Sequence, residues 1–336
     1  MNFKHIIFIT YFLVISSVAS AQFYVTGDDP GRLRWKSLDT DSYRIIYPSE
    51  TDSLAHVYAA KLERFKIPVS RTTGYVTGEG DGKLMPVVLH AYNGSNGSVA
   101  WAPKRMDLFT LPSAYDVDPL PWSTMLAVHE SRHVTQMQFG MTRFQRPFGY
   151  VFGEMWNILV SIVYPNMYFI EGDAVVTETA LTKSGRGRTA DFLNYYRIAF
   201  DNGDFRRWNQ WLYGSQRNYY PDRYALGYML LGNMRLMYDC PMYMYDSYYR
   251  ASSKIWDICS FQTIAKQKSG KKFEDMFQDI CRRMNAQWQQ EDSLRGPFME
   301  FEPVGKEPRL YTDYKDNLVV ALSPILITEE PLLRDS

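Results

Sequence analysis

Apolar and polar residues alternate over several short runs in the N-terminal part of the chain. Residues 33–47 predict two strands about a turn at Asp39–Ser42, because Asp, Thr and Ser favour turns. Residues 53–65 place apolar side chains at helical spacing. Residues 85–90 and 99–102 predict a third and a fourth strand. A small sheet with one helix is therefore expected before residue 122.

Helical spacing dominates the rest of the chain. Residues 122–139 predict a helix that ends at Gly140, a residue typical of helix C-termini. Residues 148–170 are strongly apolar, but polar residues and Pro165 interrupt the run, so we expect a buried helix that ends near Pro165 and no membrane insertion. Further helices are expected over residues 168–183, 189–200, 222–238 and 272–292.

These elements predict an α+β protein. Residues 22–140 are expected to hold a small mixed sheet together with the helix at 122–139, and residues 141–300 a mainly helical subdomain. Residues 301–336 form a tail with short strand-like pieces. No internal repeat is visible along the chain.

The N-terminus has the pattern of a secretory signal. Lys4 precedes an apolar run from Ile6 to Val18, and Ala19–Ala21 is a small-residue cleavage site, so residues 1–21 are expected to be removed. The alternative, a membrane anchor, requires ~20 apolar residues, which is longer than this run. We expect an exported protein of the periplasm, the cell envelope or the medium, with no transmembrane segment after cleavage.

Charge and cysteine content exclude some functions. Lys plus Arg equals Asp plus Glu at 37 each, without a basic stripe, so no nucleic-acid partner is expected. The three cysteines lack metal-ligand spacing. An oxidising compartment would permit a Cys259–Cys281 disulfide, and buried free thiols are the alternative.

The strongest chemical signal is His129-Glu130-Ser131-Arg132-His133, an H-E-x-x-H run inside the helix expected at 122–139. Residues four apart share a helical face, so both imidazoles can reach one ion. Glu130 lies about 100° round the helix and can act as a general base toward a water molecule. Zn²⁺ suits such nitrogen ligands, and a catalytic zinc site requires a third protein ligand.

The downstream run Glu171-Gly172-Asp173-Ala174 offers that third ligand. Glu171 is the candidate, and Asp173 is its competitor. Glu178 lies two turns beyond Glu171 on the same helical side. It is expected to accept a hydrogen bond that orients one of the ligands.

Residues 129–133 and 169–178 together resemble the gluzincin branch of the zincin metallopeptidases, the peptidase-MA-like group that includes the aminopeptidase N family. In that group the third ligand is the Glu of a W-x-x-E-G-x-A segment, and a second Glu follows seven residues later. Glu171 and Glu178 match both places, while Tyr168 stands in the Trp position. The resemblance covers roughly residues 33–295 and implies a zincin-like peptidase fold with Zn²⁺ held by His129, His133 and Glu171.

Two further segments are similar to parts of that family. Tyr224-Ala-Leu-Gly227 matches a Tyr-x-x-Gly segment, which implies that Tyr224 donates a hydrogen bond to the developing oxyanion. In a chain with 25 tyrosines, a purely structural Tyr224 is the alternative. Val99, Ala100 and Trp101 occupy the place of the edge strand that pairs with extended substrate.

Other family features are missing. The aminopeptidase motif G-x-M-E-N has no match before His129, so the choice between endopeptidase and exopeptidase stays open. The arrangement also resembles secreted bacterial peptidase domains that precede a β-propeller. Residues 301–336 are too short for a propeller and are expected to be either a linker or the stump of a truncated propeller.

The sequence thus predicts a secreted zinc metallopeptidase that acts on a peptide or protein. The first alternative is a catalytically silent envelope binding or assembly module that retains the fold and has an envelope protein partner. A zinc hydrolase of non-peptide amides is the second. The remaining mature histidines, His56 and His90, are expected to be structural.

Overall fold

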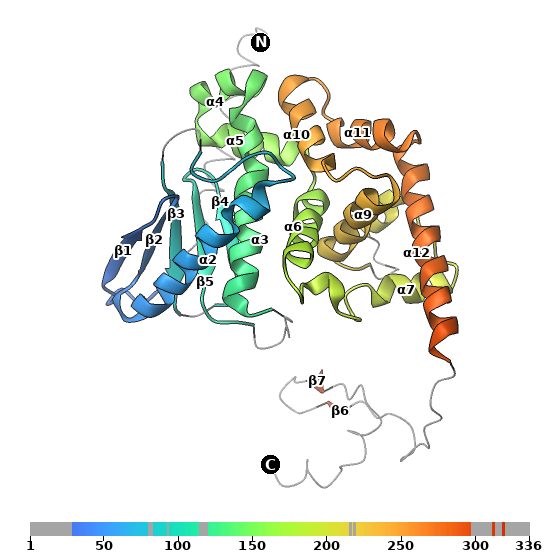
Figure 1. Cartoon of the computed structure of the whole chain (residues 1–336), viewed down its shortest axis with the longest axis horizontal. Helices are drawn as coiled ribbons and strands as arrows, with labels where there is room; N and C mark the ends of the chain where they lie inside the picture. The colour runs from blue at the N-terminus through green and yellow to red at the C-terminus, as the bar shows by residue number, and fades with distance from the viewer. Residues whose placement is uncertain are drawn as a thin grey trace, which may run out of the picture. The chain divides into compact units, whose positions relative to one another are not determined.

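The structure is a computed structural model. It describes residues 29–79, 83–92, 94–113, 120–214, 217 and 220–296, and the backbone of residues 311–312 and 318–319. The chain divides into two compact units, Met1–Ala286 and Gln287–Ser336. In the first unit, a small mixed sheet is followed by a mostly helical remainder (Figure 1), which confirms the α+β class.

The sheet has five strands in the order β1-β2-β3-β5-β4. Their bounds are β1 Trp35–Asp39, β2 Tyr43–Pro48, β3 Met85–His90, β4 Gly97–Ala100 and β5 Arg105–Phe109. β2, β3 and β5 run parallel, while β1 and β4 lie antiparallel at the two edges. The first three strands were expected at these places, and β5 was not. β4 begins and ends two residues earlier than expected, so Trp101 lies in the turn after it.

One face of the sheet packs against two helices, α2 (Asp52–Ser70) and α3 (Trp122–Gln136). β2 buries every second side chain, as a strand with one covered face must. The core between sheet and helices contains Tyr43, Ile45, Tyr58, Leu62, Val87, Leu89, Met106, Leu108, Leu126 and Ala127. Each large apolar side chain buried there contributes about 1.5–3 kcal/mol. This core fixes α3 against the sheet.

Helices make up the rest of the described part of the first unit. They are α4 Arg146–Phe152, α5 Glu154–Val163, α6 Met167–Leu181, α7 Asn194–Asp201, α8 Trp208–Tyr213, α9 Arg223–Met237, α10 Tyr243–Ser253 and α11 Ser260–Ser269. α12 (Phe273–Arg295) begins in the first unit and ends in the second. Four of these helices, α6, α7, α9 and α12, correspond to the expected ones with shifted ends. α8, α10 and α11 were not expected.

The expectation of one buried helix over residues 148–165 is wrong. Gly153, with φ 62°, separates α4 from α5. The polar residues Asn157 and Ser161 face inward, while Ile162 is 70% exposed. An apolar run does not show which side of a helix packs inward, because the inward side depends on which neighbouring elements are present. Among the described residues, no helix combines the length and the apolar character that a membrane span requires.

The three cysteines are free thiols, so the Cys259–Cys281 disulfide does not form in this structure. The expected signal, residues 1–21, lies outside the described residues. Of the tail, the structure describes one short antiparallel pair, β6 (Tyr311–Thr312) with β7 (Leu318–Val319).

Candidate metal centre

Three buried side chains from two helices converge in the first unit. His129 and His133 lie one turn apart on α3, and Glu171 lies in the second turn of α6. The Oε2 atom of Glu171 is 3.3 Å from Nε2 of His129 and 3.2 Å from Nε2 of His133. One donor atom from each residue lies within 4.8 Å of the others, so this group can bind a metal ion.

A pair of glycines brings Glu171 to this position. Gly172 of α6 faces Gly227 of α9, and a Cβ added to either would lie within 3 Å of the opposing backbone. Without side chains at the crossing, the two helices approach in direct backbone contact. Glu171, next to Gly172, and Tyr224, one helical turn before Gly227, are thereby brought to the same site.

Hydrogen bonds orient both imidazoles. Gln136 uses its amide nitrogen to donate to the carbonyl of Ile170 at 2.9 Å and to Asp173 at 2.8 Å. Its Oε1 must therefore accept from Nδ1 of His133, at 2.8 Å. Nε2 of His133 is then left with its lone pair toward Glu171, as a metal ligand requires.

Glu178 contacts Nδ1 of His129, as Gln136 contacts Nδ1 of His133. Its Oε2 lies 3.2 Å from Nδ1 of His129, and Arg186 donates to both of its carboxylate oxygens, at 2.7 and 3.1 Å. Burial raises the pKa of Glu178, but hydrogen bonds from His129 and the charge of Arg186 outweigh burial and lower the pKa to about 2. Nδ1 of His129 thus faces this ionised carboxylate and also lies 3.0 Å from Nη2 of Arg186, so Nε2 is the nitrogen that faces Glu171.

Asp173, the competing ligand candidate, is engaged elsewhere. It is fully buried and lies 2.6 Å from Arg132 and 2.6 Å from Arg235. The charges of the two arginines outweigh burial and hold the pKa of Asp173 below its usual range. Gln136 also donates to Asp173. Glu171 is therefore the carboxylate of the candidate metal group. Asp173 instead links α6 to α3 and α9 through its contacts outside that group.

The electrostatics of the cluster fit a cation. Burial raises the pKa of Glu171, but the two imidazoles outweigh burial and hold it far below its usual range. Burial lowers the pKa of His129, but hydrogen bonds to Glu171 and Glu178 outweigh it and raise the pKa to about 9. The site thus stabilises positive charge between its donor atoms. A divalent ion satisfies that demand without the proton.

Glu130 lies beside the cluster with an unsatisfied oxygen. Its side chain is buried, and Oε2 has no hydrogen-bond partner among the described residues. Burial raises the pKa of this carboxyl. A Cβ on Gly97 of β4 would lie 2.5 Å from Oε1 of Glu130, so a larger residue there would displace the carboxylate from its present position. A buried carboxylate without a partner implies that a polar molecule completes its contacts.

Two arginines that the sequence did not single out border Tyr224. The tyrosine ring lies 5.9 Å from the His129 ring and between the guanidinium groups of Arg186 and Arg223, at 5.1 and 5.5 Å. Nε of Arg223 is also 3.6 Å from Oε1 of Glu171. Arg223 adjoins Tyr224 in the chain, but no spacing pattern marks either arginine. They were found only from the fold.

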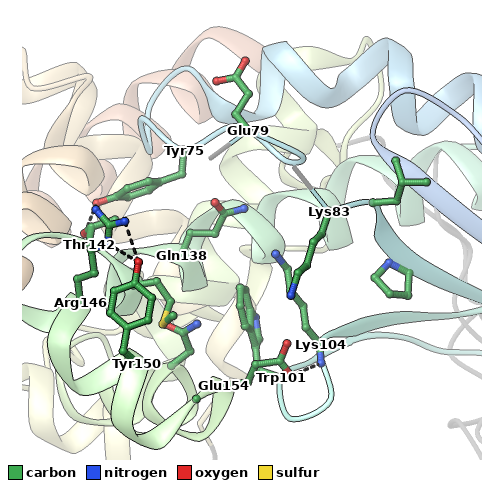
Figure 2. A pocket seen from close by; sticks show the side chains of 15 residues that line it. Tyr75, Glu79, Lys83, Trp101, Lys104, Gln138, Thr142, Arg146, Tyr150 and Glu154 are labelled. Carbon is green, nitrogen blue, oxygen red and sulfur yellow. Dashed lines mark hydrogen bonds between the residues drawn. The ribbon is translucent and has the colours of Figure 1, made fainter. Parts of the chain in front are cut away.

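The expected substrate-binding residues lie at the edge of the sheet and beyond it. Val99 and Ala100 belong to β4, which pairs only with β5 in the described part of the chain. Trp101 is buried in the following turn and lines a pocket of about 660 Å³. Figure 2 shows Trp101, Lys104, Gln138 and Tyr150 around this pocket, between the turn after β4, the 3-10 helix Met137–Met141 that follows α3, and α4.

His56 and His90 lie outside the cluster. His56 is exposed on α2, and His90 lies between Asp29 and Asp107, at 2.6 and 3.3 Å. No protein-family model matches this chain, and no curated protein matches its sequence.

Proposed function

We propose that this chain is a zinc-dependent metallopeptidase. One observation carries the proposal: the buried His129, His133 and Glu171 group lies beside Glu130, whose Oε2 has no partner in the described structure. Two imidazoles, one carboxylate and an adjacent acidic base are the set that zinc hydrolases use. The sequence resemblance to gluzincins supports the same fold and chemistry, as does an edge strand next to the base.

Each residue has a distinct role in this proposal. When bound, zinc supplies a Lewis acid that lowers the pKa of water and polarises a carbonyl. Glu130 accepts a proton from the attacking water and delivers it to the leaving amine. Glu178 and Gln136 hold the two imidazoles by their Nδ1 atoms. Tyr224 donates a hydrogen bond to the oxyanion.

Extended substrate is proposed to pair with β4. Its outer edge has no strand partner among the described residues, and Gly97 brings the strand directly against Glu130. A peptide that adds to this edge gains main-chain hydrogen bonds with little dependence on sequence. Ser98, Val99 and Ala100 supply that edge, and Trp101 borders the pocket at its end. The proposed location is outside the cytosol, and the proposed partner is a peptide or protein substrate.

Replacing Glu130 with Gln tests the proposal. The variant should keep its zinc content, because Glu130 is not a ligand, and should lose about 10²–10⁴-fold in kcat on a peptide library. Glu50→Gln, at an exposed position, is the control and should remain active. Metal analysis and cleavage assays give the two readouts.

The same experiment tests the second candidate, a catalytically silent envelope module. Such a module would bind metal, but neither the wild type nor the Glu130→Gln variant would cleave any peptide. The biological role would survive the substitution. A wild-type protein that binds zinc and cleaves nothing would contradict the peptidase proposal. Cleavage of small amides without peptide cleavage would favour the third class, a non-peptide hydrolase.

A further inference from the structure

The α4–α5 hairpin exposes apolar side chains where a helix pair usually exposes polar ones. Val151 is 75% exposed and Ile162 is 70% exposed, whereas the polar Asn157 and Ser161 of α5 are buried. This is the reverse of the pattern on a solvated helix. We call this region the α4–α5 surface, and it comprises Phe144, Val151, Leu159, Ile162, Val163 and Trp256.

Aromatic contacts and a hollow link parts of the α4–α5 surface. Within the hairpin, the Trp156 ring stacks on Phe148 at 4.8 Å and on Phe152 at 5.8 Å. An open hollow of about 980 Å³, lined by Phe144, Phe148 and Trp256, joins the hairpin to the segment after α10. The hydroxyl of Tyr164, at the end of α5, donates to the carbonyl of Ile255 at 2.6 Å. Contiguous apolar surface of this kind marks an interaction site.

The charges around this surface are mainly basic. Arg143, Arg146 and Lys254 form no ion pair with any carboxylate in the described part of the chain. Of the nearby acids, Asp257 pairs with Arg250, and Glu154 accepts hydrogen bonds from backbone amides of the turn after β4. The rim therefore presents net positive charge and attracts anionic groups.

We propose that the α4–α5 surface docks the protein onto the headgroup region of an anionic lipid bilayer. Its apolar side chains protrude, with Trp256 87% exposed, and a fluid acyl region accepts protruding side chains without a matching shape. Tryptophan and tyrosine favour the boundary between headgroups and acyl chains. Basic residues on the rim add attraction to anionic lipids. The hairpin lies on the surface and does not span the membrane.

Vesicle binding by the full chain tests this proposal. The expected result is flotation with phosphatidylcholine vesicles that contain phosphatidylglycerol, and weaker flotation with phosphatidylcholine alone or at high salt. Lipids brominated on their acyl chains should quench the tryptophan emission. Trp256→Phe should remove most of this quenching while flotation persists. Trp35→Phe, which alters a half-exposed strand residue outside the surface, is the matched control and should leave the quenching in place.

Two further variants separate the apolar and basic contributions. Val151→Ser/Leu159→Ser/Ile162→Ser should lower vesicle partitioning about tenfold or more, because exposed side chains are lost without a loss of core packing. Tyr213→Ser/Leu236→Ser, at positions 77% and 78% exposed outside the surface, should bind as the wild type does. Arg143→Gln/Arg146→Gln should abolish most of the preference for phosphatidylglycerol. Circular dichroism verifies that every variant is folded.

Three outcomes would overturn the proposal. The first is quenching that persists when both Trp156 and Trp256 are replaced with Phe, since another segment would then insert. The second is a triple serine variant that partitions as the wild type does. The third is a wild-type protein that ignores both vesicle types. Dimerisation that the triple variant abolishes would then assign the surface to a second copy, and capture of an envelope protein would assign it to a protein partner.

Discussion

Glu171 and Asp173 show how two acids on one helix acquire opposite roles from their surroundings. Glu171 faces the two imidazoles of α3, which hold its pKa far below its usual range. Asp173 turns to Arg132 and Arg235, both at 2.6 Å. Both carboxylates are ionised and buried, but only the first leaves room for a cation between its partners. Two positions apart on one helix, Glu171 is thus placed to bind a cation, whereas Asp173 is a structural anion.

Glu171→Gln and Asp173→Asn should therefore differ in their effects. Glu171→Gln removes an anionic ligand, so zinc affinity should fall by two orders of magnitude or more while the fold remains. Asp173→Asn leaves two buried arginines without their counter-charge and should cost about 3–5 kcal/mol of unfolding free energy. Metal titration and urea unfolding measure the two effects. The assignment fails if Asp173→Asn loses zinc affinity at unchanged stability.

At the scale of elements, the crossing of α6 and α9 determines the geometry of the site. Gly227 lies with its Cα so close to Tyr168 that an added Cβ would be 1.9 Å from the Tyr168 carbonyl oxygen. Backbone cannot move aside as a flexible side chain can. Any side chain at the crossing must therefore separate the helices and move Glu171 and Tyr224 away from His129.

Gly227→Ala is expected to lower the melting temperature and the activity together, at a cost of about 1–3 kcal/mol in stability. Gly232→Ala is the matched control on the same helix. An added Cβ there meets only Val176, at 4.0 Å, and alanine favours helix more than glycine does. This control should be neutral or stabilising. Equal melting temperatures for the two variants, by calorimetry, would contradict the role given to the crossing.

A pH-dependent interaction between His90 and Asp107 joins strands β3 and β5. Burial lowers the pKa of His90, but hydrogen bonds to Asp107 and Asp29 outweigh it and raise the pKa above its usual value. The stabilisation of the folded state by protonated His90 is therefore complete below pH ~6.5. It is lost as pH rises through the raised pKa of His90 in the folded state. His90→Gln should remove this decline in urea-unfolding stability, whereas His56→Gln at an exposed position should keep it. A decline of the same size in wild type and His90→Gln would refute the link.

Spacing along the chain predicted those parts of the site that lie on regular elements. His129 and His133 share a helical face because they are four residues apart, and Glu171 and Glu178 because they are seven apart. The partners Arg186 and Arg223 come from other segments and have no period to reveal them. β5 was missed because Arg105–Phe109 has two charges among its five residues. Its burial comes from neighbouring strands that periodicity cannot assign.

At the scale of the whole molecule, the helices that carry the donors are held together without an ion. Asp173 binds arginines from α3 and α9, and the glycine crossing packs α6 on α9. These contacts do not involve the donor atoms of the candidate metal group. The site is therefore preorganised, unlike those of small zinc domains that unfold without their metal.

Chelation should accordingly leave the protein folded. We expect an unchanged far-UV circular dichroism spectrum and a lower melting temperature, since a ligand at 1,000 times its Kd adds about 4 kcal/mol. Added Zn²⁺ should restore the melting temperature. Loss of helical signal on chelation would show that the ion, and not the buried charge cluster, holds the helices.

In the proposed peptidase, the edge of β4 that has no strand partner among the described residues would also limit which polypeptides are cleaved. Only a backbone in extended conformation can match the amide spacing of a strand, so a helix or a paired hairpin offers nothing to bind. Compact proteins would then resist attack except during transient local opening. Under the proposed function, their degradation rate would follow the equilibrium population of opened forms, so destabilised chains would be cleaved faster than stable ones.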